Sequence, residues 1–498
     1  MAGLTGRVPG DVARDTARRR SSVPYPAGLK GSAMHTLTVD VAVIGAGTAG
    51  LAAYRAAVAQ GARSVVIEGG PYGTTCARVG CMPSKLLIAA AEAAHSAQHG
   101  AAFGVHIDGR VVIDGREVMT RVKSERDRFV GFVLDGVASI PEEDKLVGYA
   151  RFIDKNTLQI DDHTRVHARS IVIATGSSPA VAPSFQALGD RLVVNDDIFE
   201  WDDLPASVAV FGPGVIGLEL GQALARLGVR VRVFGASGRV GPLTDPAVRA
   251  SALEAFNQEF ALDPAAQVEA MQNEGDAVSV RFTDRNGLPR SERFDYVLAA
   301  TGRRPNVAGL ALENTGLSLD ARGVPLFDPA TLQCGTEPVF VAGDVNDVLP
   351  LLHEAADEGR SAGRNAACWP DVVPLTRTAA MAVVFSDPQI MLVGKHFTEL
   401  DPQSIVVGEV SFANQGRSRV MLENRGLLHV YAERDGGRFV GAEMVGPRAE
   451  HLAHLLAWSV QQKLTIAQML AMPFYHPVIE EGLRTALRDA ETRLRGDD

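Results

Sequence analysis

The amino-acid sequence predicts an α/β fold with two Rossmann-like domains and a C-terminal α+β domain. Two glycine-rich turns support the first part of this prediction, because each follows a buried-strand pattern and opens a helical pattern. A change to strands followed by helices from about residue 376 supports the second part. With 498 residues, the chain is long enough for about three domains of ~150 residues each.

The first Rossmann-like unit spans residues 39–68. An apolar strand pattern at 39–44 leads into spaced glycines, and an alanine-rich helical pattern follows up to Gln60. The spaced glycines are Gly45, Gly47 and Gly50. Glycines in this setting let the backbone approach a pyrophosphate, whose charge lies against the helix N-terminus. The second strand pattern ends at Glu68, whose carboxylate can accept hydrogen bonds from a free ribose diol, so this unit suits FAD or NAD.

The second unit spans residues 207–234 and repeats the order strand, glycine turn, helix, strand, with strand patterns at 207–211 and 230–234. Its glycines are Gly212, Gly214 and Gly217. The position equivalent to Glu68, 18 residues beyond the third glycine, is Gly235. Without a carboxylate there, a 2′-phosphate is not repelled, and Ser237 and Arg239 offer a hydroxyl and a guanidinium. This pattern slightly favours NADPH. The alternative is that Arg239 is a solvated loop cation and that NADH is used.

A close pair of cysteines, Cys76 and Cys81, precedes an apolar helical pattern. The C-x4-C spacing at the entry to a helix can bring two sulfurs within bonding distance, and the helix N-terminus favours the thiolate form. Zinc is the alternative, but Cys334 and Cys368 have no Cys or His neighbour at ligand spacing. We therefore expect a redox pair and no metal site.

Near the C-terminal end, His476 precedes a proline, and Glu481 follows five residues later at the start of a helical pattern. A carboxylate in that position can lie beneath the imidazole, fix its tautomer and raise its basicity. A single histidine is more often structural than catalytic, so its meaning depends on the rest of the chain. Two Ala-Thr-Gly turns, at 174–176 and 300–302, indicate crossings between domains.

Composition and charge exclude several classes of protein. The chain is 46% hydrophobic, as in ordinary globular proteins, and its net charge of -10 argues against a nucleic-acid partner. The apolar runs are far shorter than the ~18 residues that a membrane-spanning helix needs, so no membrane association is expected. The first 33 residues are rich in arginine, glycine and proline and lack an apolar core, which predicts disorder rather than a secretory signal. We expect a cytoplasmic protein.

Taken in order, these motifs resemble the class I pyridine nucleotide-disulfide oxidoreductases, the flavoprotein family of dihydrolipoamide dehydrogenase, glutathione reductase and mercuric reductase. The resemblance covers residues 36–490 and also includes Gly343-Asp344 and Ala300-Thr-Gly-Arg-Arg-Pro-Asn306. It implies an FAD-binding domain at 36–180 and 306–373, an NAD(P)-binding domain at 181–305, and a dimerisation domain at 374–498, after a disordered extension at 1–35. It also implies a homodimer with shared active sites.

The resemblance assigns roles residue by residue. Cys81 would lie against the flavin, and Cys76 would be the more exposed sulfur, which exchanges with the substrate. His476 would serve the partner subunit as acid-base catalyst, oriented by Glu481. Lys85 and Glu219 would pair beside the flavin. The remaining FAD contacts would be Ala150, Thr175, Gly176, Asp344, Leu351, Leu352 and His353, and those to NAD(P) would be Val268 and Gly302.

Within the family, Cys-x-x-Val-Gly-Cys followed by Pro-Ser-Lys resembles dihydrolipoamide dehydrogenase and mercuric reductase. The last cysteine is Cys368, so we do not expect the C-terminal cysteine pair with which mercuric reductases take up the metal. Dihydrolipoamide dehydrogenase is therefore the expected activity. The alternatives are an NADPH-dependent reductase of another small disulfide or a quinone, and a docking subunit of a 2-oxo acid dehydrogenase complex. Arg55 and Arg78 could attract an anionic disulfide.

Overall fold

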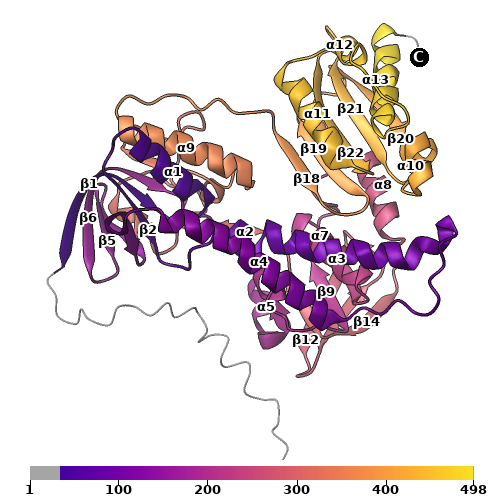
Figure 1. Ribbon diagram of the computed structural model, residues 1–498, viewed down its shortest axis with the longest axis horizontal. Coiled ribbons are helices and arrows are strands. Elements are labelled where there is room, and N and C mark those ends of the chain that lie inside the picture. The colour runs from indigo at the N-terminus through magenta and orange to yellow at the C-terminus, as the bar shows by residue number, and fades with distance from the viewer. Residues whose placement is uncertain (1–33, 497–498) are drawn as a thin grey trace, which may run out of the picture. The chain divides into compact units, whose positions relative to one another are not determined.

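The computed structural model describes residues 34–496, so the predicted disorder of residues 1–33 lies outside the described residues. The chain forms two compact units (Figure 1). The first contains the described residues up to Thr74 together with Gly131–Ser178 and Pro305–Leu375. The second contains Thr75–Val130, Pro179–Arg304 and the described residues from Thr376 onward. The predicted domain boundaries stay predictions.

The first unit is built on a mixed sheet in the order β3-β2-β1-β6-β5-β4, with β17 also paired to β6. Strands β1, β2, β6 and β17 run parallel, and the C-terminal half of β1 is buried, as its continuous apolar pattern predicts. The strands are β1 (His35–Ile44), β2 (Ser64–Glu68), β3 (Lys145–Val147), β4 (Ala150–Asp154), β5 (Thr157–Ile160), β6 (Thr164–Ile173) and β17 (Val339–Val341).

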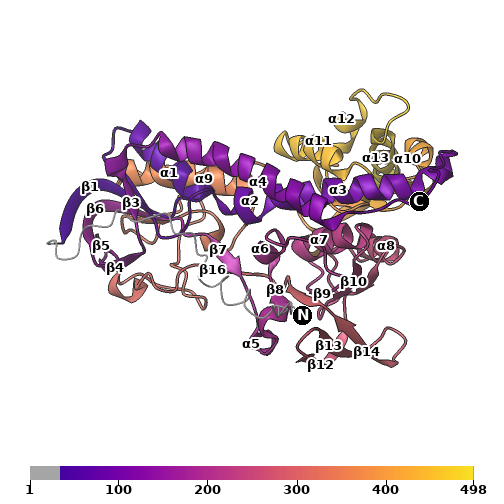
Figure 2. The same ribbon diagram turned by 60° about the horizontal axis from the view of Figure 1, so that its bottom comes forward.

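Two helices of this unit, α1 (Thr48–Ala59) and α9 (Leu352–Cys368), lie side by side in both ribbon views (Figures 1 and 2). Glycines on α9 make this close crossing possible. A Cβ atom at Gly359 would lie 2.2 Å from the carbonyl oxygen of Ala49, and one at Gly363 would lie 2.1 Å from that of Ala53. Any side chain at these positions would push the helices apart.

The second unit contains a parallel sheet in the order β11-β10-β9-β15-β8 and a separate antiparallel sheet, β12-β13-β14. Strands β9 and β10 have the predicted bounds: β9 is an apolar run after Ser207, β10 alternates arginine with valine, and a glycine turn follows each. The strands are β8 (Leu192–Val193), β9 (Ser207–Phe211), β10 (Arg230–Phe234), β11 (Ala261–Asp263), β12 (Gln267–Asn273), β13 (Val278–Thr283), β14 (Pro289–Phe294) and β15 (Tyr296–Ala299).

The helices on this part of the second unit are α2 (Thr75–Val79), α3 (Cys81–His99), α5 (Pro183–Gln186), α6 (Asn195–Ile198), α7 (Val215–Arg226) and α8 (Pro246–Phe256). Helix α3 packs along α7 through buried Leu87 and Ala91. Three further elements reach or cross the boundaries between the units, namely α4 (Gly115–Ala138), β7 (Ser177–Pro179) and β16 (Arg303–Pro305).

The C-terminal part of the second unit is an antiparallel sheet in the order β18-β19-β22-β21-β20, packed against helices. This arrangement confirms the predicted α+β architecture. Its elements are β18 (Met381–Val384), β19 (Gln389–Gly394), β20 (Ile405–Ser411), α10 (Gly416–Met421), β21 (Leu427–Glu433), β22 (Phe439–Gly446), α11 (Ala449–Gln461), α12 (Ile466–Leu470) and α13 (Glu480–Arg495).

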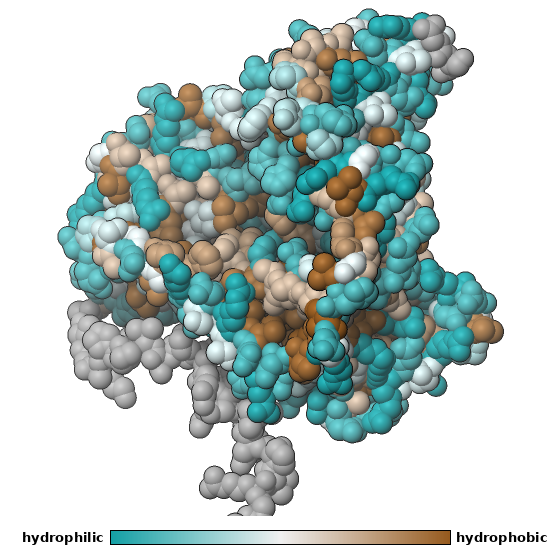
Figure 3. All heavy atoms as spheres, turned by 45° about the vertical axis from the view of Figure 1, so that its right-hand side comes forward, coloured by the Kyte–Doolittle hydropathy of each residue, from teal (hydrophilic) through white to brown (hydrophobic). Residues whose placement is uncertain are grey.

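Hydrophilic residues cover most of the face shown in Figure 3, with hydrophobic residues in small groups between them. Within residues 34–496, no helix combines the length and the apolar character that crossing a membrane requires.

Candidate active site

The two cysteines of the C-x4-C motif come from consecutive helices. Cys76 lies in α2, and Cys81 is the first residue of α3, which runs for 19 residues. Gly80 joins them, and a Cβ atom there would lie 3.0 Å from the carbonyl oxygen of Thr75 and 3.1 Å from the Cα atom of Cys76. The glycine therefore allows the start of α3 to fold closely onto α2 and bring the sulfurs together.

The exposure of the cysteines in the single chain differs from the expectation. Cys81 is exposed and Cys76 is half-buried, whereas Cys76 was expected to be the more exposed sulfur. Gly80 packs closely on the backbone of Cys76, and Cys81 stands at the first position of α3. Both cysteines are free in this structure.

The pKa values of the two thiols are shifted in opposite directions. A hydrogen bond from the Cys76 thiol, helped by the positive charge of Lys85, lowers the pKa of Cys81 to about 6, although Glu219 and the partial desolvation of the sulfur, in a residue that is otherwise exposed, oppose the shift. The same hydrogen bond, together with burial, raises the pKa of Cys76. At neutral pH the pair therefore holds one thiolate, on Cys81, and one proton, on Cys76. Such a pair can break and re-form a disulfide.

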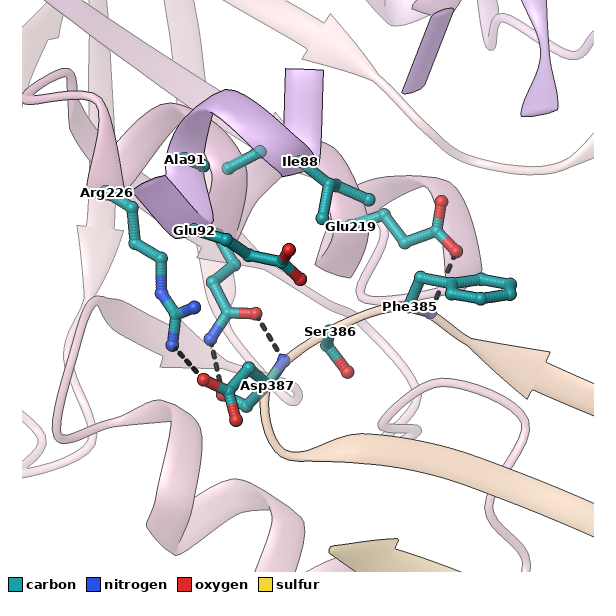
Figure 4. Close-up of a pocket in the computed structure, with 10 residues that line it drawn as sticks. Ile88, Ala91, Glu92, Glu219, Arg226, Phe385, Ser386 and Asp387 are labelled. Atoms are coloured by element: carbon teal, nitrogen blue, oxygen red, sulfur yellow. Dashed lines mark hydrogen bonds and ion pairs between the residues drawn. The ribbon is translucent and has the colours of Figure 1, made fainter. Parts of the chain in front are cut away.

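Lys85 lies one helical turn after Cys81 on α3 and forms an ion pair with Glu219 of α7, with 2.7 Å between Nζ and Oε2. The sequence resemblance implied this pairing, and the structure contains it. The Glu219 side chain is only 5% exposed, so its charge requires a close partner. Its second oxygen accepts a hydrogen bond from the backbone N–H of Phe385 at 3.0 Å (Figure 4).

Sequence reasoning missed two residues in this neighbourhood. Phe385 follows β18 and contacts the Lys85–Glu219 pair, as described below. Asn195 is buried at the start of α6, and its side-chain amide donates to the carbonyl oxygen of Val79 at 2.9 Å, between the two cysteines. Neither residue belongs to a motif, and each lies more than 100 positions away from its partner, so a single sequence contains no signal for these contacts.

His476 and Glu481 come together at the start of α13. The Nδ1 atom of the imidazole lies 3.0 and 3.1 Å from the two carboxylate oxygens, and the carboxylate also accepts the backbone N–H of Val478 at 3.3 Å. The imidazole lowers the pKa of Glu481. The His476 side chain is 82% exposed, and within the described part of one chain it bonds to neither cysteine. Glu481 therefore engages the Nδ1 side of the ring, and most of the side chain is exposed.

The glycine turn of the first unit fits a bound dinucleotide. Gly45 has a φ of +102°, and a Cβ atom there would lie 2.4 Å from the carbonyl oxygen of Ala174. At Gly47, the residue that opens α1, nothing lies within 4 Å of a Cβ position, so the space is open for a phosphate. Gly50 closes the turn, because a Cβ atom there would lie 1.8 Å from the Gly45 oxygen.

The carboxylates of the first unit also suit the hydroxyl groups of FAD. Backbone N–H groups of Ala46 and Gly70 donate to the two oxygens of Glu68 at 2.7 and 2.8 Å. They fix the carboxylate in place and leave other lone pairs for a ribose diol. The hydroxyl of Ser177 donates to Asp344 at 3.1 Å and orients it in the same way. The residues present therefore fit FAD.

The other FAD-site predictions fall at three places in the first unit. Ala150 begins β4 and is buried. Thr175 and Gly176 follow β6, and the Thr175 hydroxyl donates to the carbonyl oxygen of Asn306 at 2.7 Å. The last group stands at the start of α9 and consists of Leu351, Leu352 and His353. No bound ligand tests these roles, which stay predictions.

The glycine turn of the second unit has the same geometry. Gly212 has a φ of +107°, Gly214 opens α7 with nothing within 4 Å of a Cβ position, and a Cβ atom at Gly217 would lie 1.9 Å from the Gly212 oxygen. Gly302, which also has open space around it, adopts a φ of +112° after β15. Val268 lies half-buried in β12.

At the ribose end the second unit differs from the first, because it has a glycine where the first unit has the carboxylate of Glu68. Gly235 is buried, and a Cβ atom there would lie 2.5 Å from the carbonyl oxygen of Pro264 and 2.7 Å from the ring of Pro213. Ser237 and Arg239 are exposed in the loop that follows. Among residues 34–496, no carboxylate lies within ion-pair distance of Arg239, so its charge is available to a ligand.

Comparison with known proteins supports this assignment of the motifs. Residues 39–359 match the family described as pyridine nucleotide-disulphide oxidoreductase, and residues 380–487 match the dimerisation domain of that family, which supports a homodimer. A mercuric reductase from Shigella flexneri is 31% identical over 504 residues, covering 97% of this chain and 88% of that protein. A dihydrolipoyl dehydrogenase from Haloferax volcanii is 30% identical, covering 91% and 96%.

Solved structures agree on the fold. LpdA from Mycobacterium tuberculosis superposes with a TM-score of 0.77 at 25% identity, covering 90% of this chain and 99% of that one. The flavoprotein disulfide reductase RclA from Escherichia coli superposes with a TM-score of 0.76 at 22% identity, covering 91% and 99%. From its glycine turns, its cysteine pair and these matches, the chain belongs to the pyridine nucleotide-disulphide oxidoreductase family, as an FAD-containing enzyme that also binds a pyridine nucleotide.

Proposed function

We propose that this enzyme exchanges electrons between NAD(P)(H) and a small dithiol, as dihydrolipoyl dehydrogenases do. The observation that carries the proposal is the placement of Cys76 and Cys81 on consecutive helices joined by Gly80, with the Lys85–Glu219 ion pair one helical turn beyond Cys81. In this arrangement the pKa of Cys81 is lowered and that of Cys76 is raised. A sulfur with a pKa of about 6 is a good leaving group at neutral pH. The disulfide of such a pair is readily opened by attack on Cys76.

In the dithiol-oxidising direction, a substrate thiolate attacks the Cys76 sulfur of the oxidised pair. The Cys76–Cys81 bond breaks, and Cys81 leaves as a thiolate that Lys85 stabilises. The second substrate thiolate then attacks the substrate sulfur of the mixed disulfide, so that the substrate leaves as a disulfide and Cys76 leaves as a thiolate, which takes up the proton that His476 removed from the substrate. FAD, when bound, supplies the two-electron exchange between the reduced pair and the nicotinamide.

His476 of the second subunit is the proposed base for the substrate thiol. Its ring is held by Glu481 at Nδ1 and most of its side chain is exposed, which suits proton transfer to a group outside its own chain. Glu481 keeps its charge because the imidazole lowers its pKa, so it can stabilise the protonated ring after the transfer. The homodimer is therefore part of the proposed site.

The experiment is a steady-state assay of the purified dimer with dihydrolipoamide and NAD or NADP. We expect turnover that disappears in Cys76→Ser, while FAD stays bound. A wild-type rate no higher than that of Cys76→Ser would overturn the proposal. Activity with NADP above that with NAD would support the slight preference for NADPH, which rests on Gly235 and on the free charge of Arg239.

A second candidate function is the NADPH-dependent reduction of an anionic disulfide. A groove of about 450 Å³ runs between α1 and α9 in the first unit, and three arginines line it. They are Arg55, Arg360 and Arg364, all exposed. Guanidinium groups arranged in this way attract carboxylates. Oxidised glutathione with NADPH tests this candidate, and turnover above that with dihydrolipoamide would favour it over the first.

We also propose a cytoplasmic location.

A further inference from the structure

A short segment after β18, residues 385–387, lies against one face of α7. Three residues of that helix hold it: Glu219, Gln222 and Arg226, which are three and four positions apart and so share a face (Figure 4). Gln222 exchanges two hydrogen bonds with the backbone of Asp387, at 2.6 and 2.7 Å. Arg226 donates to the Asp387 carboxylate at 2.8 Å. The segment is therefore fixed at its far end, independently of the redox centre.

At its near end the segment touches both members of the Lys85–Glu219 ion pair. The backbone N–H of Phe385 donates to one oxygen of Glu219 at 3.0 Å, and the Lys85 ammonium group forms an ion pair with the other oxygen at 2.7 Å. The phenyl ring of Phe385 lies under the ammonium group, with Nζ 4.5 Å from the ring centroid. One residue thus contacts both charges, through its backbone and through its ring.

These contacts matter because Lys85 is only partly enclosed. Its side chain is 32% exposed, and a long ammonium side chain at that exposure has several rotamers of similar energy. A cation over an aromatic face is attracted by the ring quadrupole, which restricts that freedom. The groups that act electrostatically on Cys81 are Lys85 on its own helix, Cys76 on α2 and Glu219 on α7. Of these, only Lys85 is a cation.

We propose that Phe385 is a positioning residue, whose ring holds the Lys85 ammonium group where it stabilises the Cys81 thiolate. This inference rests on the proposed function, because the thiolate matters only if the cysteine pair is the redox centre. It assigns the aromatic ring a role that the backbone contact to Glu219 does not share. Replacing the ring while keeping the backbone therefore separates the two.

The experiment measures the ionisation of Cys81 in the reduced, FAD-loaded dimer. The ultraviolet absorbance of the Cys81 thiolate is followed against pH, a readout that needs no reagent to reach a sulfur expected to lie against the flavin, and Cys81→Ser supplies the baseline. For Phe385→Leu we expect the midpoint, about 6 in the wild type, to rise by about half a unit, which halves the thiolate fraction near pH 6. Phe385→Tyr keeps the aromatic face and should stay close to the wild type.

Phe397→Leu is the matched control, since Phe397 is half-buried in the same C-terminal sheet region and contacts Tyr431 rather than the ion pair. It should leave the midpoint unchanged. In a Lys85→Met background, Phe385→Leu should add no further shift, because the ring then has no cation to hold. This double substitution detects any change that the leucine causes by altered packing alone.

The inference is overturned if Phe385→Leu and Phe397→Leu have the same midpoint, if Phe385→Tyr shifts as far as Phe385→Leu, or if the shift persists without Lys85. Failure of the proposed function would show differently. In that case the wild type would not turn over dihydrolipoamide, while its Cys81 ionisation, and the effect of Phe385 on it, could still be measured.

Discussion

The two Rossmann-like units of this enzyme have nearly the same backbone geometry at the glycine turn, where a pyrophosphate would lie. They differ at the position where the adenosine ribose would lie. At the phosphate end, Gly47 and Gly214 open their helices with φ, ψ values of -76°, -170° and -79°, -171°. The third glycines, Gly50 and Gly217, would place a Cβ atom 1.8 and 1.9 Å from the oxygen of the first glycine. Sterics leave no alternative to glycine there, so both units have the same turn.

At the ribose end the units differ in chemistry and in packing. Glu68 is a carboxylate held in place by two backbone N–H groups. Gly235 is enclosed by Pro213 and Pro264, and Arg239 is exposed in the loop that follows. The comparison teaches that the phosphate end requires only space for the backbone, whereas the ribose end is where the two units differ in charge; we propose that this charge selects the nucleotide. Four predictions test this division, from the largest expected effect to the smallest.

Replacing the third glycine of one turn with alanine should impair cofactor binding in that unit and leave the other unit intact. Gly50→Ala should abolish FAD binding, because the new methyl group overlaps the Gly45 oxygen and overpacking of this kind costs about 1–3 kcal/mol. Gly217→Ala should leave FAD bound and abolish nucleotide reduction of the flavin. Flavin absorbance of the purified protein measures the first effect and stopped-flow reduction by NADPH the second. Gly131→Ala, in open space on α4, is the control, and equal effects of both variants on both cofactors would contradict the comparison.

His476→Gln should impair the chemistry while sparing both units. We expect thiol oxidation to slow by ~10²- to 10⁴-fold, because the proposed general base is lost, with FAD content and NAD(P)H-dependent flavin reduction unchanged. Rapid-reaction measurement of the two half-reactions separates these outcomes. His106→Gln, at an exposed loop histidine, serves as the control. An unaltered rate with dihydrolipoamide would show that His476 has no role in turnover.

Arg239→Ala should change the choice of nucleotide. Loss of a guanidinium group that faces a 2′-phosphate should lower kcat/KM for NADPH about tenfold and leave that for NADH nearly unchanged. The ratio of the two values, measured on the same preparation, is the readout. Arg285→Ala removes another exposed arginine of the same region and should change neither value. A parallel fall for both nucleotides would count against the charge-selection argument.

Gly235→Ala should have the smallest effect on activity. The added methyl group meets the Pro264 oxygen and the Pro213 ring, so we expect a loss of stability of about 1–3 kcal/mol and a lower thermal midpoint, with the NADPH to NADH ratio kept. Calorimetry and the same nucleotide assays measure both. For the same reason, glutamate at this position should weaken both nucleotides rather than restore a preference for NAD. A clean switch to NADH in Gly235→Glu would show that the loop adapts.

Much of the local structure could be predicted from the sequence. Strands β9 and β10 begin and end at the predicted residues, and β2 ends at the predicted Glu68, because a glycine turn or loop closes each strand pattern. The pairing of Lys85 with Glu219 joins positions 134 apart and was implied only by family resemblance. The contacts of Asn195 and Phe385 were not predicted, because no spacing in a single sequence encodes them.

The sequence by itself therefore determined the two glycine turns, the cysteine pair and the family, because each depends on residues within one short stretch whose geometry is set by local sterics. Only the tertiary structure decided which cysteine is exposed, which thiol loses its proton, and that Gly235 has no room for a side chain. Those properties arise where distant segments meet, since burial and electrostatic fields depend on every group within a few ångströms, whatever its position in the chain.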